Sequence, residues 1–333
     1  MSGTVSVVIV TYNGRALLES CLLALFGGSR CPDEIIVIDN DSTDDTVPWL
    51  HHTYPVSCVL RCSANLGFAA ANNAGIRASS GSFVMTLNND TQVAPDALAR
   101  LTTTLDEADA SVGAAMSTMV FAESPTIIAS AGLETFTNGV VRDAGVGEAI
   151  NPRRAPFPIF GPSAGAALYR RAALDDVGLF DPAFFMYLED ADLAWRLRLR
   201  RWSTVTVPDA IIRHAVSATA GYGSPRKVYY LARNRWWCIA KNMPGALLRE
   251  CAVPIARYDA AAFAYAMATG DRASLMGRHD ALAECAVLRK ARSRIQACVT
   301  ASDDEIRQWL QPAPPLTAPL RERQVIRALI RGK

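Results

Sequence analysis

Long apolar stretches are missing from this sequence, and none approaches the ~20 residues that a membrane-spanning helix needs. The first residues, MSGTVSVVIVTYNG, have neither a basic leader nor a long apolar core, so we expect no signal peptide. A net charge of only +2 gives no indication of nucleic-acid binding. With 333 residues, 50% of them hydrophobic, the chain is long enough for one large α/β domain and an appendage.

Disulfide and zinc patterns are missing as well. The eight cysteines include no Cys-x-x-Cys pair, and the four histidines show no zinc spacing. Several cysteines lie inside apolar runs, as Cys21 does in SCL. We therefore expect reduced thiols that pack as small hydrophobic side chains in a cytoplasmic protein.

The glycine-rich loops of two nucleotide-binding enzyme classes are also absent. A nicotinamide dehydrogenase carries Gly-x-Gly-x-x-Gly after its first strand. A sugar-nucleotide-forming nucleotidyltransferase carries a glycine-rich, basic phosphate loop there. The segment VTYNGRALLES, 10–20, supplies neither motif. Both classes are therefore disfavoured.

What the sequence does contain is a regular alternation of strand and helix patterns. β-branched, almost wholly apolar runs such as VSVVIVT are typical of strands buried on both faces of a parallel sheet. Helical periodicity separates them at intervals of roughly 25 residues, which indicates βαβ units. The predicted strands are 5–11, 34–40, 57–61 and 82–88, and the predicted helices are 15–26, a segment after Ser42 as N-cap, and 67–79.

Polar side chains follow three of these strands at the point where each ends. The three groups are Thr11-Tyr12-Asn13, Asp39-Asn40-Asp41 and Asn88-Asn89-Asp90. In parallel sheets, ligands bind beyond the carboxyl ends of the strands. One such group is ordinary, and all three are also compatible with solvated turns. Three groups on one sheet edge favour a binding site.

The rest of the chain is less regular. Residues 136–163 are rich in Gly, Pro and Arg, which predicts a mobile loop region suited to substrate contacts. A strand at 164–170 and a short helix ending at Gly178 follow. From 228 onward Ala, Leu and Arg dominate, which predicts a helical appendage with a basic tail at 320–333.

A second acidic cluster lies in FFMYLEDADLAWRLRLRRW, 184–202. Acids before bases suit a helix dipole, although the alternating apolar residues would also suit a strand. Asp192 and Arg196 are spaced to pair on a helix, and we interpret Asp192 as decoration of the helix start. Asp190 is a candidate to accept a proton from a bound hydroxyl. His214 is either a packed histidine or a metal ligand.

Together these segments resemble the inverting nucleotide-sugar glycosyltransferases of family 2, which have the GT-A fold. They are similar in particular to the bacterial rhamnosyl- and galactofuranosyl-transferase-like branch. The resemblance is carried by VSVVIVTYNG, IIVIDNDSTDDT, NLGFAAANNAGIRASSGSFVMTLNNDT and GLFDPAFFMYLEDADLAWRLRLRRW, and more weakly by RHAVSAT and YYLARNRWW. It implies a catalytic domain at 1–225, with a nucleotide-binding half at about 1–120 and an acceptor half at about 121–225. Residues 226–333 would form a helical C-terminal region.

The resemblance also implies roles for the polar strand ends. Asp39 matches the carboxylate that accepts a hydrogen bond from the pyrimidine N3–H. Asn72 stands where many relatives have an arginine near the nucleotide. The implied nucleotide-binding residues are Thr11, Tyr12, Asn13, Asp39, Asn65, Asn72 and Asn89.

The metal and the base follow from the same resemblance. Asn88-Asn89-Asp90 stands for the Asp-x-Asp signature, in which only Asp90 keeps a charge. His214 lies where galactofuranosyl-type relatives have a metal-binding histidine. Asp90, Asn88 and His214 are therefore the implied ligands of Mg²⁺ or Mn²⁺. Asp190 matches the general base, which removes the acceptor proton during a single inverting displacement.

The implied function is transfer of a sugar from a nucleoside-diphosphate sugar to a cell-envelope glycan or a polyprenyl-diphosphate-linked acceptor. dTDP-rhamnose is the first choice of donor, and a UDP-sugar such as UDP-galactofuranose is the alternative. A non-catalytic nucleotide-sugar- or carbohydrate-binding protein is the alternative of another class.

Acceptor and membrane contacts are expected from YYLARNRWWCIAK, 229–241, which interleaves aromatic and basic residues. Glu189, Arg233 and Trp236 are the candidate acceptor-binding residues. The segment suits either a packed helix with snorkelling bases or an interfacial face anchored by Trp236 and Trp237. On the second interpretation, the protein is cytoplasmic and peripheral on the cytoplasmic face of the inner membrane.

Overall fold

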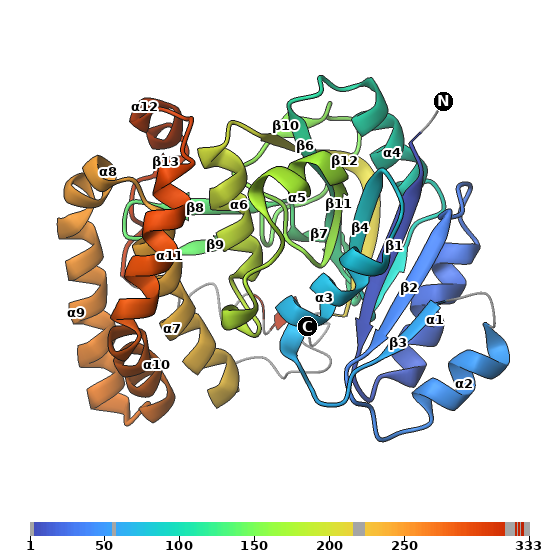
Figure 1. Cartoon of the computed structure of the whole chain (residues 1–333), viewed down its shortest axis with the longest axis horizontal. Coiled ribbons are helices and arrows are strands. Elements are labelled where there is room, and N and C mark those ends of the chain that lie inside the picture. The colour runs from blue at the N-terminus through green and yellow to red at the C-terminus, as the bar shows by residue number, and fades with distance from the viewer. Residues whose placement is uncertain are drawn as a thin grey trace.

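A ten-stranded mixed sheet lies between two helical layers in this computed structural model (Figure 1). The structure describes residues 3–54, 58–215 and 224–316, together with residues 324, 326, 328 and 329. Most of the predicted basic tail, 320–333, lies outside the described residues. The strand order is β10-β12-β6-β11-β4-β1-β2-β3, with β5 paired to β12 and β7 paired to β6.

The parallel part of the sheet confirms the predicted strands. It consists of β1 (Val5–Thr11), β2 (Glu34–Asp39), β3 (Cys58–Arg61) and β4 (Phe83–Asn88). Thr11 lies opposite Asp39, and Val10 lies opposite Asn88. The three polar strand ends therefore lie at one edge of the sheet.

The remaining strands bring the second half of the chain to the same edge. They are β5 (Thr91–Val93), β6 (Val112–Phe121), β7 (Ser124–Ser130), β10 (Phe157–Pro158), β11 (Ala166–Arg170) and β12 (Ser203–His214). β11 runs antiparallel to β4, and β12 runs parallel to β6. β5 pairs with β12 so that His214 lies opposite Thr91.

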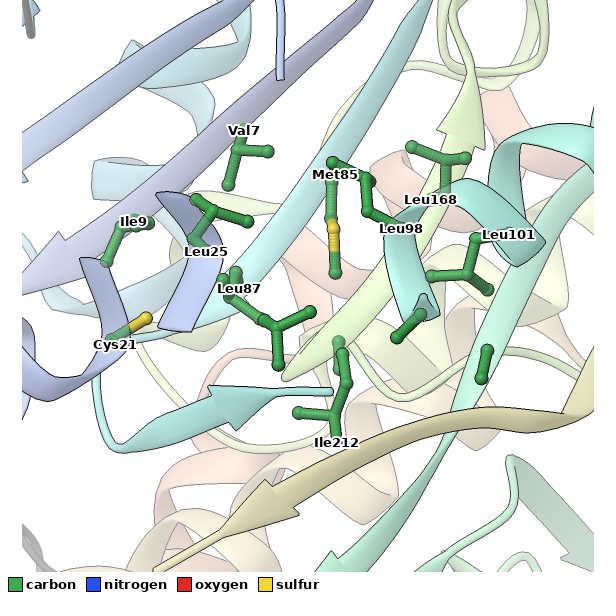
Figure 2. Packing of buried hydrophobic residues seen from close by; sticks show 14 of the residues in the cluster. Val7, Ile9, Cys21, Leu25, Met85, Leu87, Leu98, Leu101, Leu168 and Ile212 are labelled. Atoms are coloured by element: carbon green, nitrogen blue, oxygen red, sulfur yellow. The ribbon is translucent and has the colours of Figure 1, made fainter. Parts of the chain in front are cut away.

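Helices cover both faces because apolar side chains alternate along the buried strands. Val7 and Ile9 face α1 (Arg15–Phe26), α2 (Thr46–Thr53) and α4 (Ala97–Glu107) in one core. Figure 2 shows Cys21, Leu25, Leu98 and Leu101 packing in that core. Val8 faces α3 (Gly67–Ala78), α5 (Arg171–Val177) and α6 (Glu189–Leu199) in a second core.

Part of the predicted mobile loop, 136–163, is instead a β-hairpin, so that prediction was wrong. β8 (Leu133–Phe136) and β9 (Val141–Asp143) pair antiparallel, and β13 (Leu310–Gln311) joins β8. The turn contains Asn138-Gly139, with Gly139 at φ 73° and the Asn138 side chain accepting from Val140 N at 3.1 Å. Asn-Gly between apolar runs is a strong hairpin signal.

The C-terminal region is helical, as predicted. It contains α7 (Pro225–Asn242), α8 (Gly245–Glu250), α9 (Ala252–Thr269), α10 (Arg272–Ala283), α11 (Cys285–Ala297) and α12 (Asp303–Arg307). Trp237 of α7 is 3% exposed and packs edge-on against Phe184, which lies in the 3-10 turn η1 (Pro182–Phe184). Trp237 is therefore a core residue and not a membrane anchor. None of the described helices is long and apolar enough to cross a bilayer.

Ser42 does not cap α2, contrary to the prediction. The helix begins at Thr46, whose backbone N–H donates to the Asp44 carboxylate at 3.1 Å. The Ser42 hydroxyl instead accepts from Asn13 N at 2.9 Å. The serine therefore joins the β1 and β2 ends, a long-range role that local sequence does not signal.

Candidate active site

The ends of β1 and β2 form a preorganised polar corner. Asp39 is fully buried, and both of its oxygens lie 3.3 Å from Ser42 N, while Arg61 Nε lies 3.6 Å from Oδ2. Asn13 has a left-handed φ of 48°, and its side-chain oxygen accepts from Thr43 N at 2.8 Å. These bonds fix the loops after both strands. Tyr12 is 38% exposed at the same corner and is available to a ligand.

Two asparagines support this corner from α3 and its entry. Asn65 accepts from Asn40 Nδ2 at 3.1 Å and from Gly67 N at 3.0 Å, which fixes the start of α3. Asn72 is 1% exposed, and its amide donates to Phe68 O of the same helix at 2.9 Å. The Asn72 side chain is thus buried and bonded to the backbone of its own helix. Its predicted contact with a nucleotide stays a prediction.

The end of β4 meets β12 at a pair of metal-ligand types. His214 Nε2 lies 3.2 Å from Asp90 Oδ1 and 3.4 Å from Asn88 Nδ2. The Asp90 and His214 side chains are 9% and 17% exposed. Asn89 instead donates to Thr11 Oγ1 at 3.1 Å. Within the described ranges, no group of three or more His, Cys, Asp or Glu could hold a metal.

A strained segment delivers the second acidic group. Phe185, Tyr187 and Leu188 have φ values of 63°, 67° and 64°, in the left-handed region that non-glycine residues avoid. Asn234 of α7 is fully buried, and its amide nitrogen lies 3.0, 3.0 and 2.7 Å from the carbonyl oxygens of Phe184, Met186 and Tyr187. This amide holds the unusual backbone that starts α6 at Glu189. The start of α6 confirms the helix prediction.

Asp190 sits at that helix start, half-buried. Its carboxylate accepts from Ala191 N at 2.8 Å and from Ala164 N at 3.3 Å. Burial, followed by the negative charge of Asp143, raises the pKa of Asp190 to about 6. A carboxylate with such a pKa is ionised near neutral pH and is basic enough to take a proton.

The two acidic groups belong to one region of the molecule. Gly165 O accepts from Asn88 N at 2.9 Å, while the preceding residue, Ala164, donates to Asp190. Asn88 and Asp190 are thus connected through adjacent backbone units. The two acidic motifs of the sequence therefore meet beside the end of β4.

Comparisons with known proteins identify the family of the chain. Residues 6–178, just over half of the chain, match the family model described as glycosyl transferase family 2. The chain belongs to that family. The glycosyltransferase is 29% identical over 245 residues to the N-acetylglucosaminyl-diphospho-decaprenol L-rhamnosyltransferase of Mycobacterium tuberculosis, an alignment that covers 66% of this chain and 79% of the relative.

Solved structures confirm the GT-A fold. The mannosyltransferase PcManGT from Pyrobaculum calidifontis, in complex with GDP-Man and Mn²⁺, superposes with a TM-score of 0.54 at 19% identity and covers 99% of this chain and 86% of its own. S. aureus TarS 1–349 in complex with UDP-GlcNAc gives a TM-score of 0.53 at 17% identity over 98% and 90% of the two chains. At these identities the likeness establishes the fold alone.

The structure places the predicted acceptor residues of the glycosyltransferase near α6 and α7. Glu189 is 5% exposed, its Oε2 has no hydrogen-bond partner among the described residues, and burial together with Asp190 raises its pKa. Arg233 is 8% exposed and contacts Glu284 at 3.2 Å and Ala183 O at 3.0 Å. Trp236 is half-buried. Their acceptor contacts stay predictions.

Asp192 does not merely decorate the helix start of the glycosyltransferase, so that interpretation was wrong. It is fully buried and contacts Arg196 Nε at 3.0 Å, Lys241 Nζ at 2.7 Å and Asn242 Nδ2 at 2.8 Å. Burial would raise its pKa, but the positive charges of Lys241 and Arg196 prevail and lower it to about 2. Asp192 therefore anchors α6 to α7 as an ion-paired core residue.

Sequence reasoning missed two residues of the site, Asp143 and Asn234. Asp143 is the last residue of β9 and lies opposite Leu133 of β8. The Leu133 backbone N–H donates to Gly161 O at 2.7 Å, and Gly161 belongs to the loop that leads to Ala164. Burial raises the pKa of Asp143, and a hydrogen bond with Ser130 opposes that rise. The hairpin signal at Asn138-Gly139 could have predicted strand β9. No local sequence signal, however, indicates that Asp143 lies close to Asp190.

Proposed function

We propose that this glycosyltransferase moves a sugar from a nucleoside diphosphate to an acceptor hydroxyl with inversion, using Asp190 as the general base. The supporting observation is the half-buried Asp190 carboxylate, with a pKa of about 6, next to the loop that contacts Asn88. A base with a pKa near the working pH is largely ionised and still able to take up a proton. General-base assistance of this kind raises the reaction rate by ~10²–10⁴-fold.

The proposed reaction is a single displacement. The acceptor oxygen forms a bond to the anomeric carbon from the face opposite the diphosphate, whose bond to that carbon breaks. The acceptor proton passes to Asp190, and the diphosphate keeps the electron pair. The hydrogen bonds from Ala164 N and Ala191 N hold the carboxylate in one orientation throughout.

The donor set at Asp90 fits a divalent ion. A carboxylate and an imidazole, 3.2 Å apart, can both ligate one ion, and Asn88 adds an amide beside them. Mg²⁺ and Mn²⁺ need only one or two carboxylates when phosphates supply further oxygens. Bound there, the ion would neutralise charge on the departing diphosphate. The imidazole favours Mn²⁺ over Mg²⁺ because nitrogen is a poor ligand for the harder ion.

The nucleotide would lie against the β1–β2 corner. Asp39 is buried and bonded to one backbone N–H, so its oxygens retain capacity for the N3–H of uracil or thymine. Thr11, Tyr12 and Asn13 complete that edge. We propose dTDP-rhamnose as the donor, supported by the rhamnosyltransferase relative, with a UDP-sugar as the alternative.

The acceptor that we propose is a glycan carried on a polyprenyl diphosphate, because the mycobacterial relative is named for such a substrate. The enzyme would then work peripherally at the cytoplasmic face of the inner membrane. In this proposal residues 1–225 form the catalytic domain, and residues 226–333 form the C-terminal region that positions it.

A donor panel tests the proposal. We expect dTDP-rhamnose with Mn²⁺ to raise the melting temperature more than UDP-galactofuranose, UDP-GlcNAc or GDP-mannose, because ligands that bind the folded state stabilise it. Asp39→Asn should lose the preference for thymine and uracil nucleotides, while Asp176→Asn, on remote α5, should keep it. If no nucleotide sugar stabilises the protein and none is hydrolysed or transferred, the proposal is wrong.

A further inference from the structure

Helix α9 turns an apolar face to solvent. Val253, Phe263 and Met267 are 67%, 53% and 59% exposed. Ala256, Ala260 and Ala264 are exposed between them. The spacing of these six residues follows the helical repeat, so they form one stripe along four turns. An ordinary surface helix shows the opposite arrangement, with its apolar stripe facing the core.

The inner side of α9 is fixed by few groups. Ile255 and Ala266 are its only buried residues among those described. Asp259, the one acidic residue of the helix, is paired with Arg235 of α7 at 3.0 Å and with Arg278 of α10 at 3.6 Å. The exposed stripe therefore carries no negative charge, and Arg257 lies at its edge.

Exposed bases flank both ends of α9 and one edge of the stripe. Each of the five acids between 245 and 297 is engaged: Glu250 with Arg307, Asp259 with Arg235, Asp271 with Ser274 N, Asp280 with Tyr229 and Glu284 with Arg233. Among the residues that the structure describes, no carboxylate lies within 4.0 Å of the exposed bases of this segment. The bases on α9 itself or on the adjoining ends of α8 and α10 are Arg257, Arg249 and Arg272.

We infer that the α9 stripe, defined as Val253, Ala256, Ala260, Phe263, Ala264 and Met267, docks on the surface of an anionic phospholipid bilayer. An apolar helix face rimmed by bases fits the acyl–headgroup boundary, where phosphates complement the positive charge. A second copy of the chain is the poorer occupant, because it would bring like charges together and supply no acid to Arg257. The inference extends the proposed function, in which the acceptor is lipid-linked.

The position of α9 suits such docking. It is the outermost helix of the C-terminal region, at the left of Figure 1. It runs from α8 toward α10, and Figure 1 shows β1 running toward the same end of the molecule. In that view the last turns of α9 and the end of β1 therefore point toward the same side of the molecule. The α9 stripe takes the place of buried Trp237, which cannot make a membrane contact.

Flotation of the full chain with vesicles tests the inference. At low salt we expect the protein to float with phosphatidylglycerol vesicles and to stay below with phosphatidylcholine vesicles. Phe263→Ser with Met267→Ser should weaken the association about tenfold, and Arg257→Glu should also weaken it. The matched control is Leu23→Ser on α1, since Leu23 is 61% exposed and remote from α9. It should float like the wild type.

Three outcomes would overturn the inference. The first is a wild-type protein that stays unbound at low salt, and the second is flotation that the α9 variants do not change. The third is a dimer that Phe263→Ser with Met267→Ser dissociates, without lipid binding, which would assign the stripe to a second copy. Thermal stabilisation by nucleotide sugars, measured on the same variants without lipid, reports on the proposed function separately. It should be unchanged by them.

Discussion

Replacing Asn234 by Ala should uncouple catalysis from donor binding. The Asn234 amide nitrogen lies within 3.0 Å of three carbonyl oxygens in the segment 184–187. That segment contains two of the three left-handed residues that lead into Asp190. The substitution removes the donor that keeps this backbone in place and leaves buried carbonyls without partners.

The magnitude follows from the number of bonds. An amide has two protons, so about two hydrogen bonds are lost, and each unsatisfied buried group costs ~1–3 kcal/mol. Left-handed non-glycine residues store ~1–3 kcal/mol each, so the segment gains by relaxing once it is released. We expect unfolding free energy to fall by about 2–4 kcal/mol. Because misplacement by ~1 Å costs about 10²-fold, we expect kcat to fall about 100-fold.

Steady-state transfer kinetics and urea unfolding measure the two effects. The donor KM should stay near the wild-type value, since the donor corner is formed by β1 and β2. Asn73→Ala is the matched control, because buried Asn73 makes two bonds to Phe180, at 2.7 and 3.1 Å, and none to 185–188. It should lose similar stability and keep kcat. Equal kcat values for the two variants would refute a positioning role for Asn234.

Three further predictions concern charge. The pKa of Asp190 is raised to about 6, first by burial and then by the negative charge of Asp143. We therefore expect kcat to fall as pH drops through about 6, and Asp143→Asn to move the midpoint of that fall to lower pH. A pH profile of kcat that Asp143→Asn leaves unchanged would contradict this. The raised folded-state pKa also means that ionised Asp190 destabilises the fold, so Asp190→Asn should melt higher than the wild type at pH 8 but not at pH 4. Lys241→Met leaves Asp192 buried with one counter-charge fewer, so we expect the free energy of unfolding, measured in urea, to fall by ~3–5 kcal/mol. The control Lys290→Met, at an exposed base, should change it little. Equal losses in the two variants would argue against the buried ion pair.

Short-range sequence patterns predicted much of the fold. The apolar runs of β1, β2 and β4 predict buried parallel strands because every side chain in them meets a covered face. Their polar ends predict the shared edge because parallel strands end together. The start of α6 was predicted from its order of acids and bases. In each case the physical signal lies within one short segment.

The remainder depends on contacts between distant segments. Asn234 and Asp143 have no local signature, since their meaning comes from the carbonyls of 184–187 and from Asp190. Asp192 was interpreted as a surface acid because its partner Lys241 lies far along the chain. For Trp237 the sequence left both a packed helix and a membrane anchor open, because an aromatic–basic pattern is typical of either. Only the tertiary fold distinguishes these alternatives.

The most direct test of the account is sugar transfer by Asp190→Asn. The amide keeps the shape of the side chain but cannot take the acceptor proton. We predict that kcat falls by ~10²–10⁴ while donor-induced thermal stabilisation stays at the wild-type level. Asp176→Asn, an exposed carboxylate paired with Arg200, serves as the control and should retain activity. Wild-type turnover by Asp190→Asn would contradict the assignment of the base and, with it, the proposed mechanism.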